Sequence, residues 1–315
     1  MFCLDLKTTD PFFNLAVDEY LLKNSREEFL ILSINSPSVI IGKHQTAHRE
    51  TDTRYVTRNN IPVIRRISGG GAVFHDQGNL NFSFILNSTS GSQVNFRKYT
   101  QPVLKFLALA GVEATFEEKN DLKVNGLKIS GNAEHVWRNR VLHHGTLLFD
   151  SQLDILIKSL RKDNSCYISR AVVSNPSPVA NLKDCMVSVN DINEFKLKML
   201  DYFKNQDDKN PEVNLSREES MGINELADSR YRTWEWNYAY GPSYQLKKHL
   251  EIKGSSIILT LSVKNGIIQE CIIEGSDVFA GLAKKLTGCR HMPEDLSLVF
   301  KTEVFLSDDE VFDFF

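Results

Sequence analysis

The chain has 315 residues, of which 42% are hydrophobic and 24% are charged, and its formal net charge is −3. These proportions are ordinary for a globular protein of two domains, or of one large domain with an appendage. The charge offers no basic field to a nucleic-acid partner, and no apolar run reaches the roughly 18 residues that a membrane-spanning helix needs. The first residues also lack the pattern of a signal or transit peptide, so we expect a cytoplasmic protein without a membrane partner.

The N-terminal part is predicted to hold one helix and several strands. Asp10-Pro11 favours a helix start, because aspartate caps helices and proline suits the first helical position. Residues 29–34 and 39–42 have the composition of strands, with a turn at 35–38 between them. A further apolar segment at 61–64 predicts a strand that leads into a glycine-rich stretch.

This stretch, Gly69 to Gly71, is preceded by Arg65 and Arg66. Glycines cost chain entropy on folding, so a run of them suits positive φ angles or a close approach of the backbone. The neighbouring arginines indicate an anionic group that rests on backbone N–H groups. The stretch matches neither the P-loop nor the dinucleotide fingerprint, which needs a small residue where Phe74 stands. A flexible turn between two strands is the alternative interpretation.

Later segments read as helices, a hairpin and a long loop. Helical spacing predicts helices over residues 96–110, 191–205 and 216–230. Asn125-Gly126 between alternating segments indicates a hairpin with a two-residue turn. Residues 161–179 contain turn formers and little periodicity, so we expect a long mobile loop there, of a kind that compact domains keep for function.

The C-terminal part restarts as a small α+β pattern. Gly241-Pro242 breaks the chain, and three strands and a helix are expected between residues 250 and 287. We therefore predict a large first domain over residues 1–243 and a small second domain over residues 244–315.

The cysteines and histidines give no metal or disulfide pattern. The five cysteines are odd in number and form no C-x-x-C pair, which predicts neither a disulfide framework nor a zinc site. His143 and His144 are adjacent, and adjacent residues of a strand point to opposite faces, so they are poorly placed to share one ion.

Several short motifs occur along the chain in one order. In chain order they are Asn14-Leu15-Ala16-x-Asp18-Glu19, Asn35-x-Pro37-Ser38-Val39-Ile40-Ile41-Gly42-x-x-Gln45, Arg65-Arg66-x-Ser68-Gly69-Gly70-Gly71-Ala72-Val73-Phe74-His75-Asp76-x-Gly78-Asn79, Asn120-Asp121-Leu122, Lys128-x-Ser130-Gly131-x-Ala133, His144-Gly145-Thr146-Leu147-Leu148 and Trp234-x-Trp236. Each motif alone is weak, but the ordered set closely resembles the lipoate–protein ligase A family, within the biotin/lipoate ligase superfamily. The resemblance covers nearly the whole chain.

The resemblance implies an α/β catalytic domain of mixed sheets flanked by helices, followed by a small α+β accessory domain. It implies that lipoate and ATP, with Mg²⁺, form lipoyl-AMP and pyrophosphate. The lipoyl group would then pass to a lysine of an apo lipoyl domain, on an E2 subunit of a 2-oxoacid dehydrogenase or on the H protein of glycine cleavage, and AMP would leave. The enzyme is expected to act as a monomer.

The resemblance also implies roles for the motif residues. Lys128, which would otherwise read as a solvated lysine beside a hairpin, would be catalytic and touch the acyl carbonyl and the phosphate. Asp121 is the candidate for holding Mg²⁺, although an aspartate after an asparagine is equally a turn residue. Ala133 would line the acyl tunnel, and His75 would orient the glycine turn or serve as a buried hydrogen-bonded histidine. The remaining residues expected to bind the nucleotide are Arg66, Ser68, Gly70, Gly71, Ala72, Val73 and Phe74.

One loop departs from the family pattern. Residues 174–182 carry Pro176 and Pro178 where arginines are expected in a loop that closes on the adenylate. Without these arginines, the sequence does not predict how efficiently ATP activates the acid. Arg170 or Lys183 could replace the missing guanidinium groups.

Two other activities remain open from the sequence. An octanoyltransferase or lipoyl amidotransferase would carry the acyl group as a thioester, with Cys166 as the nucleophile and without ATP. A non-catalytic lipoate-binding protein would keep only the pocket, and the intact Lys128 and Arg66 argue against it.

Overall fold

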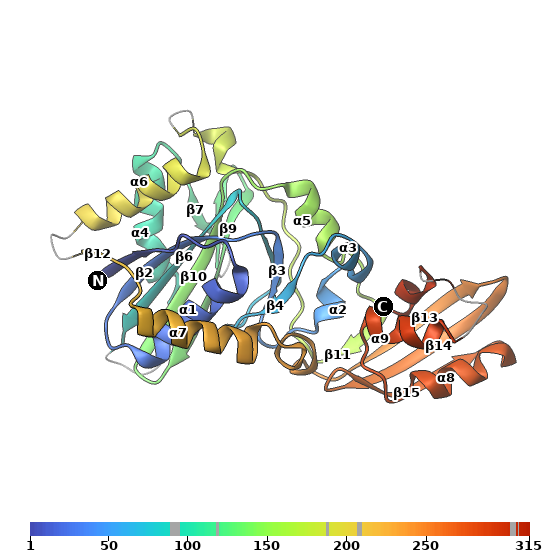
Figure 1. Ribbon diagram of the computed structural model, residues 1–315. Helices are drawn as coiled ribbons and strands as arrows, with labels where there is room; N and C mark the ends of the chain where they lie inside the picture. Colours follow the sequence, from blue (N-terminus) through green and yellow to red (C-terminus); the bar gives the residue numbers. More distant parts are fainter. Residues whose placement is uncertain (89–94, 118–119, 187–188, 207–209, 303–306, 308) are drawn as a thin grey trace.

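A mixed sheet of eight strands forms the centre of the larger part of the computed structural model, which describes residues 1–315 except 89–94, 118–119, 187–188, 207–209, 303–306 and 308 (Figure 1). The strand order is β12-β1-β2-β6-β10-β9-β8-β7. β1 runs parallel to both of its neighbours, and the other pairs are antiparallel. The strands are β1 (Phe2–Asp5), β2 (Phe29–Ile34), β6 (Asn79–Asn87), β7 (Thr115–Glu117), β8 (Asp121–Val124), β9 (Leu127–Trp137), β10 (Arg140–Leu148) and β12 (Glu212–Val213).

Helices cover both faces of this sheet. On one face Leu15 of α1 and Ile223 of α7 belong to one hydrophobic cluster. On the other face α4 and α6 pack together, and the rings of Phe106 and Phe195 have centroids 5.5 Å apart. Asp10 caps α1 by accepting from the Phe12 N–H at 3.0 Å, as its place before a proline predicts. The bounds are α1 (Pro11–Asn24), α4 (Phe96–Leu109), α6 (Ile192–Asn205) and α7 (Arg217–Leu226).

A small sheet, in the order β4-β3-β5, stands beside the large one and carries the three glycines in the turn between β4 and β5. Val39, Val56 and Phe74 share the hydrophobic cluster beneath it. The sequence patterns did not predict α2 and α3, because helices of this length show no full period. The elements are β3 (Ser38–Ile41), β4 (Val63–Arg65), β5 (Val73–His75), α2 (Ala47–Glu50), α3 (Thr53–Arg58) and α5 (Leu153–Ser159).

The C-terminal unit has its own four-stranded antiparallel sheet, β11-β13-β14-β15, and its own hydrophobic cluster. β11 lies inside the segment 161–179, where Tyr167 pairs with Leu246 of β13. The segment expected to be one long mobile loop is therefore not loop throughout. It contains the strand β11, which three residues are too few to show as an alternation in the sequence. The unit consists of β11 (Tyr167–Ser169), β13 (Tyr244–Ile252), β14 (Ser255–Lys264), β15 (Ile267–Glu274), α8 (Ala280–Leu286), α9 (Pro293–Phe300) and short 3₁₀ turns at Asp277–Phe279 and Glu310–Phe314. The domain boundary at residue 243 stays a prediction.

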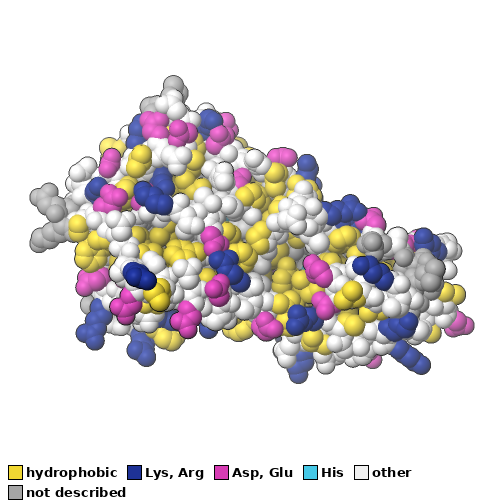
Figure 2. All heavy atoms as spheres, viewed as in Figure 1, with side chains coloured by type: hydrophobic (Ala, Val, Ile, Leu, Met, Phe, Trp, Pro, Cys, Tyr) yellow, Lys and Arg dark blue, Asp and Glu magenta, His cyan; other side chains and the backbone are white. Residues whose placement is uncertain are grey.

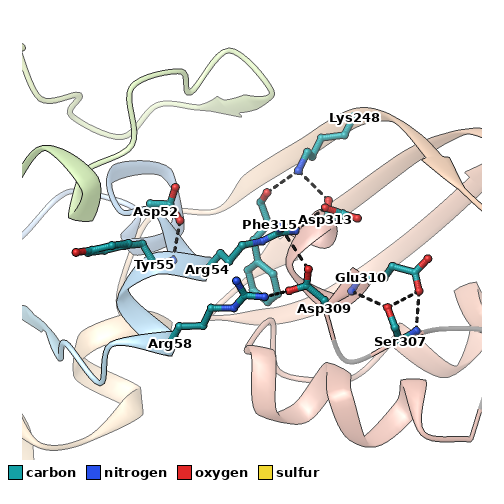
Figure 3. A network of polar contacts seen from close by, with 10 residues as sticks. All are labelled: Asp52, Arg54, Tyr55, Arg58, Lys248, Ser307, Asp309, Glu310, Asp313 and Phe315. Carbon is teal, nitrogen blue, oxygen red and sulfur yellow. Dashed lines mark hydrogen bonds and ion pairs between the residues drawn. The ribbon is translucent and has the colours of Figure 1, made fainter. Parts of the chain in front are cut away.

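Polar contacts join the C-terminal unit to the catalytic part. Arg54 of α3 reaches Asp313 at 3.0 Å, and within the C-terminal unit the Lys248 ammonium donates to the Phe315 carbonyl at 2.8 Å (Figure 3). His48 of α2 donates from Nε2 to the His291 carbonyl at 2.7 Å. We call the contacts between the two parts the seam; its residues are His48, Arg54, Arg58, His291, Asp309 and Asp313.

Some predicted elements shift their ends. The helix expected over 216–230 ends as α7 at Leu226 and continues in π-helical turns at Ala227–Tyr231 and Glu235–Ala239. The strand expected from residue 250 already begins at Tyr244. Acidic and basic side chains are interspersed over the face shown in Figure 2, in keeping with the small net charge. Within the described ranges, no helix has the length and apolar character that crossing a bilayer requires.

Candidate active site

A pocket of about 530 Å³ lies on the face of the large sheet that α1 covers. Side chains from α1, from β2, β6, β9 and β10, and from the glycine turn line it. It brings together eight of the predicted site residues. These are Arg66, Gly71, Ala72, Val73, His75, Asp121, Lys128 and Ala133. Ser68, Gly70 and Phe74 do not line it; Phe74 lies in the hydrophobic cluster under the small sheet.

Arg66 holds the glycine turn in shape. Its Nη2 donates to the Gly69 and Gly71 carbonyls at 2.6 and 2.8 Å, and its Nε donates to Ser68 Oγ at 3.0 Å. Gly70 has φ +91°, a region that side chains with a Cβ rarely adopt. Burial lowers the pKa of Arg66 to about 10, so the guanidinium remains charged at neutral pH.

Arg65 turns away from the pocket. Its guanidinium is fully buried and donates to the backbone carbonyls of Gln45 at 2.6 Å and Asn237 at 2.9 Å. The expectation that both arginines face an anion is therefore wrong for Arg65. The reason is that neighbouring residues of a strand point to opposite faces, and Arg65 ends β4. Its role is to hold the turn after Trp234 against the base of the glycine turn.

Lys128 and Asp121 lie at the β8–β9 end of the pocket. Lys128 Nζ is 2.9 Å from Asp121 Oδ1, and Asp121 is 4% exposed. The lysine side chain lies over Gly131, where an added Cβ would come within 3.2 Å of Nζ. Glycine at this position thus gives the cation room to lie across the strand toward the pocket.

The loop that departs from the family pattern supports this lysine through its backbone. The Lys128 N–H donates to the Pro178 carbonyl at 2.9 Å, and the Ala180 N–H donates to the Lys128 carbonyl at 3.0 Å. Neither of the expected substitutes lines the pocket: Lys183 pairs with Asp150 at 2.5 Å, and Arg170 is exposed. Sequence reasoning had no signal for a backbone contact of this kind.

The same loop rests on the glycine turn. Ser174 Oγ accepts from the Ala72 N–H at 2.8 Å and from Gln45 Nε2 at 3.1 Å, and it donates to Glu50. Burial raises the pKa of Glu50, and the hydrogen bonds from Ser174 oppose that rise. A backbone N–H of the glycine turn therefore donates to the loop.

A chain of hydrogen bonds runs from α1 to the glycine turn. His144 Nδ1 lies 3.3 Å from Asp18 Oδ2, and His144 Nε2 lies 2.6 Å from Ser68 Oγ. Ser68 Oγ also accepts from Arg66. The Asp18 carboxylate can only accept, so His144 donates from Nδ1, and in the neutral ring Nε2 then accepts from the Ser68 hydroxyl. The order serine–histidine–aspartate resembles a hydrolase triad. However, Ser68 does not line the pocket, so these hydrogen bonds hold the glycine turn in position. Asp18 and His144 both belong to the sequence motifs, but the motifs alone do not indicate this role.

A metal site made only of protein side chains is not present in the described part of the chain: no three His, Cys, Asp or Glu side chains gather to hold an ion. His143 and His144 point apart, as expected, and His143 pairs with Glu134 at 2.9 Å on the far side of β10. Burial lowers the pKa of His75 to about 3, with the charges of Arg66 and His144 adding to the effect, so His75 is a neutral, hydrogen-bonded residue of the pocket wall.

Known proteins match this chain over most of its length. The model of the lipoyl protein ligase A/B catalytic domain matches residues 10–204. The lipoate-protein ligase LplJ of Bacillus subtilis is 40% identical over 270 residues, which are 84% of this chain and 82% of that protein.

Solved structures agree with the sequence matches. A lipoate-protein ligase A bound with ATP superimposes with a TM-score of 0.65 at 29% identity, over 75% of this chain and 97% of that one. A bipartite lipoate protein ligase of Thermoplasma acidophilum, solved in a study of that ligase and its E2 lipoyl domain, gives a TM-score of 0.64 at 28% identity, over 75% and 95% of the two chains. With its glycine turn and lysine in one pocket, and with these matches, the chain belongs to the lipoyl protein ligase A/B family.

Proposed function

We propose that this lipoate–protein ligase activates lipoate with ATP to lipoyl-AMP and then transfers the lipoyl group to a lysine of an apo lipoyl domain. The observation that carries the proposal is the convergence of Lys128 and the glycine turn on one pocket, with Gly131 making room for the lysine. Relatives that are named lipoate ligases, and a similar ligase that binds ATP, support the choice of both substrates.

In the first step a carboxylate oxygen of lipoate attacks the α-phosphorus of ATP, the bond to the bridging oxygen breaks, and pyrophosphate leaves. Both reactants are anions, so the site must offset their repulsion. The Lys128 ammonium would do so by standing between the acyl carboxylate and the phosphate. Arg66 would act by fixing the glycine turn, since its own donors already hold backbone carbonyls.

Asp121 suits a magnesium ion that ATP brings with it. Mg²⁺ keeps several waters and is commonly held by one or two carboxylates together with phosphate oxygens, so one buried carboxylate beside the phosphate position is enough. When bound, the ion would neutralise phosphate charge. Asp121 would also keep Lys128 oriented, because the two side chains already form an ion pair at 2.9 Å.

In the second step the ε-amine of the acceptor lysine attacks the acyl carbonyl, an amide bond forms, the amine loses a proton, and AMP leaves with the phosphate oxygen. Lys128 would stabilise the negative charge that develops on the carbonyl oxygen. The acceptor class rests on the Thermoplasma acidophilum ligase, which was studied together with its E2 lipoyl domain. E2 subunits of 2-oxoacid dehydrogenases and the glycine-cleavage H protein are the acceptors we propose.

A transferase that uses a cysteine thioester fits the geometry poorly. None of the five cysteines, all of which lie in described parts of the chain, lines the pocket. The Cys166 carbonyl accepts from the Lys247 N–H at 2.9 Å, and its side chain packs against the hydrophobic cluster of the C-terminal unit.

Exchange of radiolabel between pyrophosphate and ATP, measured with and without lipoate, tests the proposal directly. We expect exchange only with lipoate, followed by a mass increase of an apo lipoyl domain when it is added. Transfer from an octanoylated carrier without ATP would point to the transferase instead, and lipoate binding without exchange would point to a binding protein.

A further inference from the structure

The floor of the pocket carries a row of polar side chains that an apolar acyl chain does not require. Ser33 of β2 pairs in register with Asn81 of β6, and Asn81 pairs with Thr146 of β10. Thr146 Oγ1 accepts from the Gly131 N–H at 3.3 Å, below the Lys128 side chain. The row therefore leads from the catalytic lysine across the sheet to β2.

Two buried amide atoms at the far end of this pocket have no partner among the described residues. They are the Nδ2 donor of Asn81 and the Oδ1 acceptor of Asn14, and both residues line the pocket. Asn14 is 5% exposed. Buried polar atoms are almost always paired in folded proteins, so unpaired ones in a pocket wall indicate groups that a ligand pairs.

Hydrogen bonds fix which atom of the Asn14 amide is free. Asn14 Nδ2 donates to the Thr8 carbonyl at 3.1 Å and to Asn35 Oδ1 at 2.7 Å, so the free atom of Asn14 is its oxygen. Asn35 must then donate from Nδ2 to His75 Nδ1 at 2.9 Å, which puts the His75 hydrogen on Nε2. These assignments all follow from the Thr8 carbonyl, because a carbonyl oxygen can only accept a hydrogen bond.

The distance across the sheet matches the length of the substrate. Neighbouring strands lie about 4.8 Å apart, so Asn81 on β6 is roughly 10 Å from the β9 strand that carries Lys128. An extended chain advances about 1.2 Å per bond, so an eight-carbon acyl chain covers roughly 8 to 9 Å. A carbonyl held at Lys128 therefore brings the end of the chain to Asn81.

We propose that Asn81 and Asn14 form a specificity site for the far end of the acyl chain, favouring chains that carry hydrogen-bonding atoms there over plain alkyl chains. This inference rests on the proposed function. The sulfur atoms of lipoate accept weakly from an N–H and contact polar atoms through their polarisability. The methyl end of octanoate would leave the Asn81 N–H buried and unpaired, and sites built to pair a substrate group reject analogues that lack it.

The test compares kcat/KM of ATP-dependent activation for lipoate, octanoate and 8-hydroxyoctanoate. For the native enzyme we expect lipoate and 8-hydroxyoctanoate each to exceed octanoate about tenfold or more. The hydroxyl probe can donate to Asn14 and accept from Asn81, and this comparison needs no variant. In Asn81→Leu, which keeps the number and branching of the side-chain heavy atoms and removes the donor, we expect the lipoate-to-octanoate ratio to fall about tenfold.

Thr146→Val is the matched control, because it removes a hydroxyl from the same row at a position nearer to Lys128. It should lower kcat/KM for all three acids alike and leave their ratios unchanged. Equal use of octanoate and lipoate by the native enzyme, or an unchanged ratio in a folded Asn81→Leu protein, would overturn the specificity site. If no acid supports ATP-dependent activation, the proposed function fails instead.

Discussion

The pocket wall and the histidines of the seam both carry buried hydrogen-bonding atoms, but they differ in whether these atoms are paired. At the seam, both ring nitrogens of His291 are paired, with the Tyr244 hydroxyl at 2.6 Å and the Phe314 carbonyl at 2.8 Å. His48 is likewise paired through both nitrogens, to Thr53 and to the His291 carbonyl. In the pocket wall, Asn14 and Asn81 each keep one unpaired atom. Paired groups of this kind stabilise one arrangement of the parts they join. Unpaired groups in a pocket wall can instead form hydrogen bonds with a ligand and so contribute to its binding.

Among the substitutions considered, Lys128→Ala should have the largest effect on the activity of the pocket. Losing one preorganised charge at the reacting carbonyl and phosphate should lower the rate of lipoyl-AMP formation on the order of 10²–10³-fold. Lipoate-dependent pyrophosphate exchange measures the loss, and thermal unfolding checks that the protein stays folded. Lys183→Ala is the control, because Lys183 pairs with Asp150 outside the pocket and should leave the exchange rate unchanged. Near-native exchange by Lys128→Ala would remove this lysine from the mechanism.

The seam should be sensitive to acid because its histidines are held neutral. Burial lowers the pKa of His291 to about 4, and it lowers that of His48 well below its usual value. The unfolded chain therefore binds protons that the folded chain does not, so the stabilisation is complete above pH ~6.5 and is lost as the pH falls toward 4. For His291 alone the loss is about 3 kcal/mol, at 1.36 kcal/mol per pH unit.

Urea unfolding between pH 7 and pH 4 measures this loss. His291→Asn should show a free energy of unfolding that depends less on pH than the native one, although it is lower at pH 7. His249→Asn, which changes an exposed histidine of β13, should follow the native curve. Parallel curves for His291→Asn and the native protein would show that the seam histidine does not titrate on unfolding.

Ser174→Ala probes the loop that rests on the glycine turn. The change removes the acceptor of the Ala72 N–H and the hydroxyl that Glu50 accepts from, so closure of the loop should weaken by about 1 kcal/mol. Hydrogen exchange at the Ala72 amide should then become roughly fivefold faster. Ser177→Ala lies in the same loop and serves as the control. Unchanged exchange at Ala72 would mean that the rest of the loop holds it closed without Ser174.

The smallest expected effect belongs to Cys166→Ser. The ligase route passes through a mixed anhydride and requires no thiolate, and Cys166 does not line the pocket. Transfer of the lipoyl group to an apo lipoyl domain should therefore be unaffected. An inactive variant, or an acyl adduct found on Cys166 by mass spectrometry, would move the chain to the transferase class.

The sequence predicted what is local and missed what depends on pairing over long distances. The cap at Asp10, the helices of the large sheet and the turn at Asn125-Gly126 follow from neighbouring residues, and they were correct. The opposite directions of Arg65 and Arg66 follow from strand geometry, but the strand had been expected to end before them. The row from Ser33 to Thr146 depends on the register of three strands that lie far apart in the chain, which periodicity does not specify.

The segment from β11 to Ala180 is fastened at both ends. Its first part is a strand of the C-terminal sheet, and its last part runs beside Lys128 and hydrogen-bonds the backbone of that lysine. A chimaera that exchanges the C-terminal unit with that of another ligase should therefore carry residues 161–182 together with residues 244–315. In a graft joined only at residue 244, β11 would have to pair as the edge strand of a foreign sheet. Any mismatch would be transmitted along the segment to the backbone of Lys128.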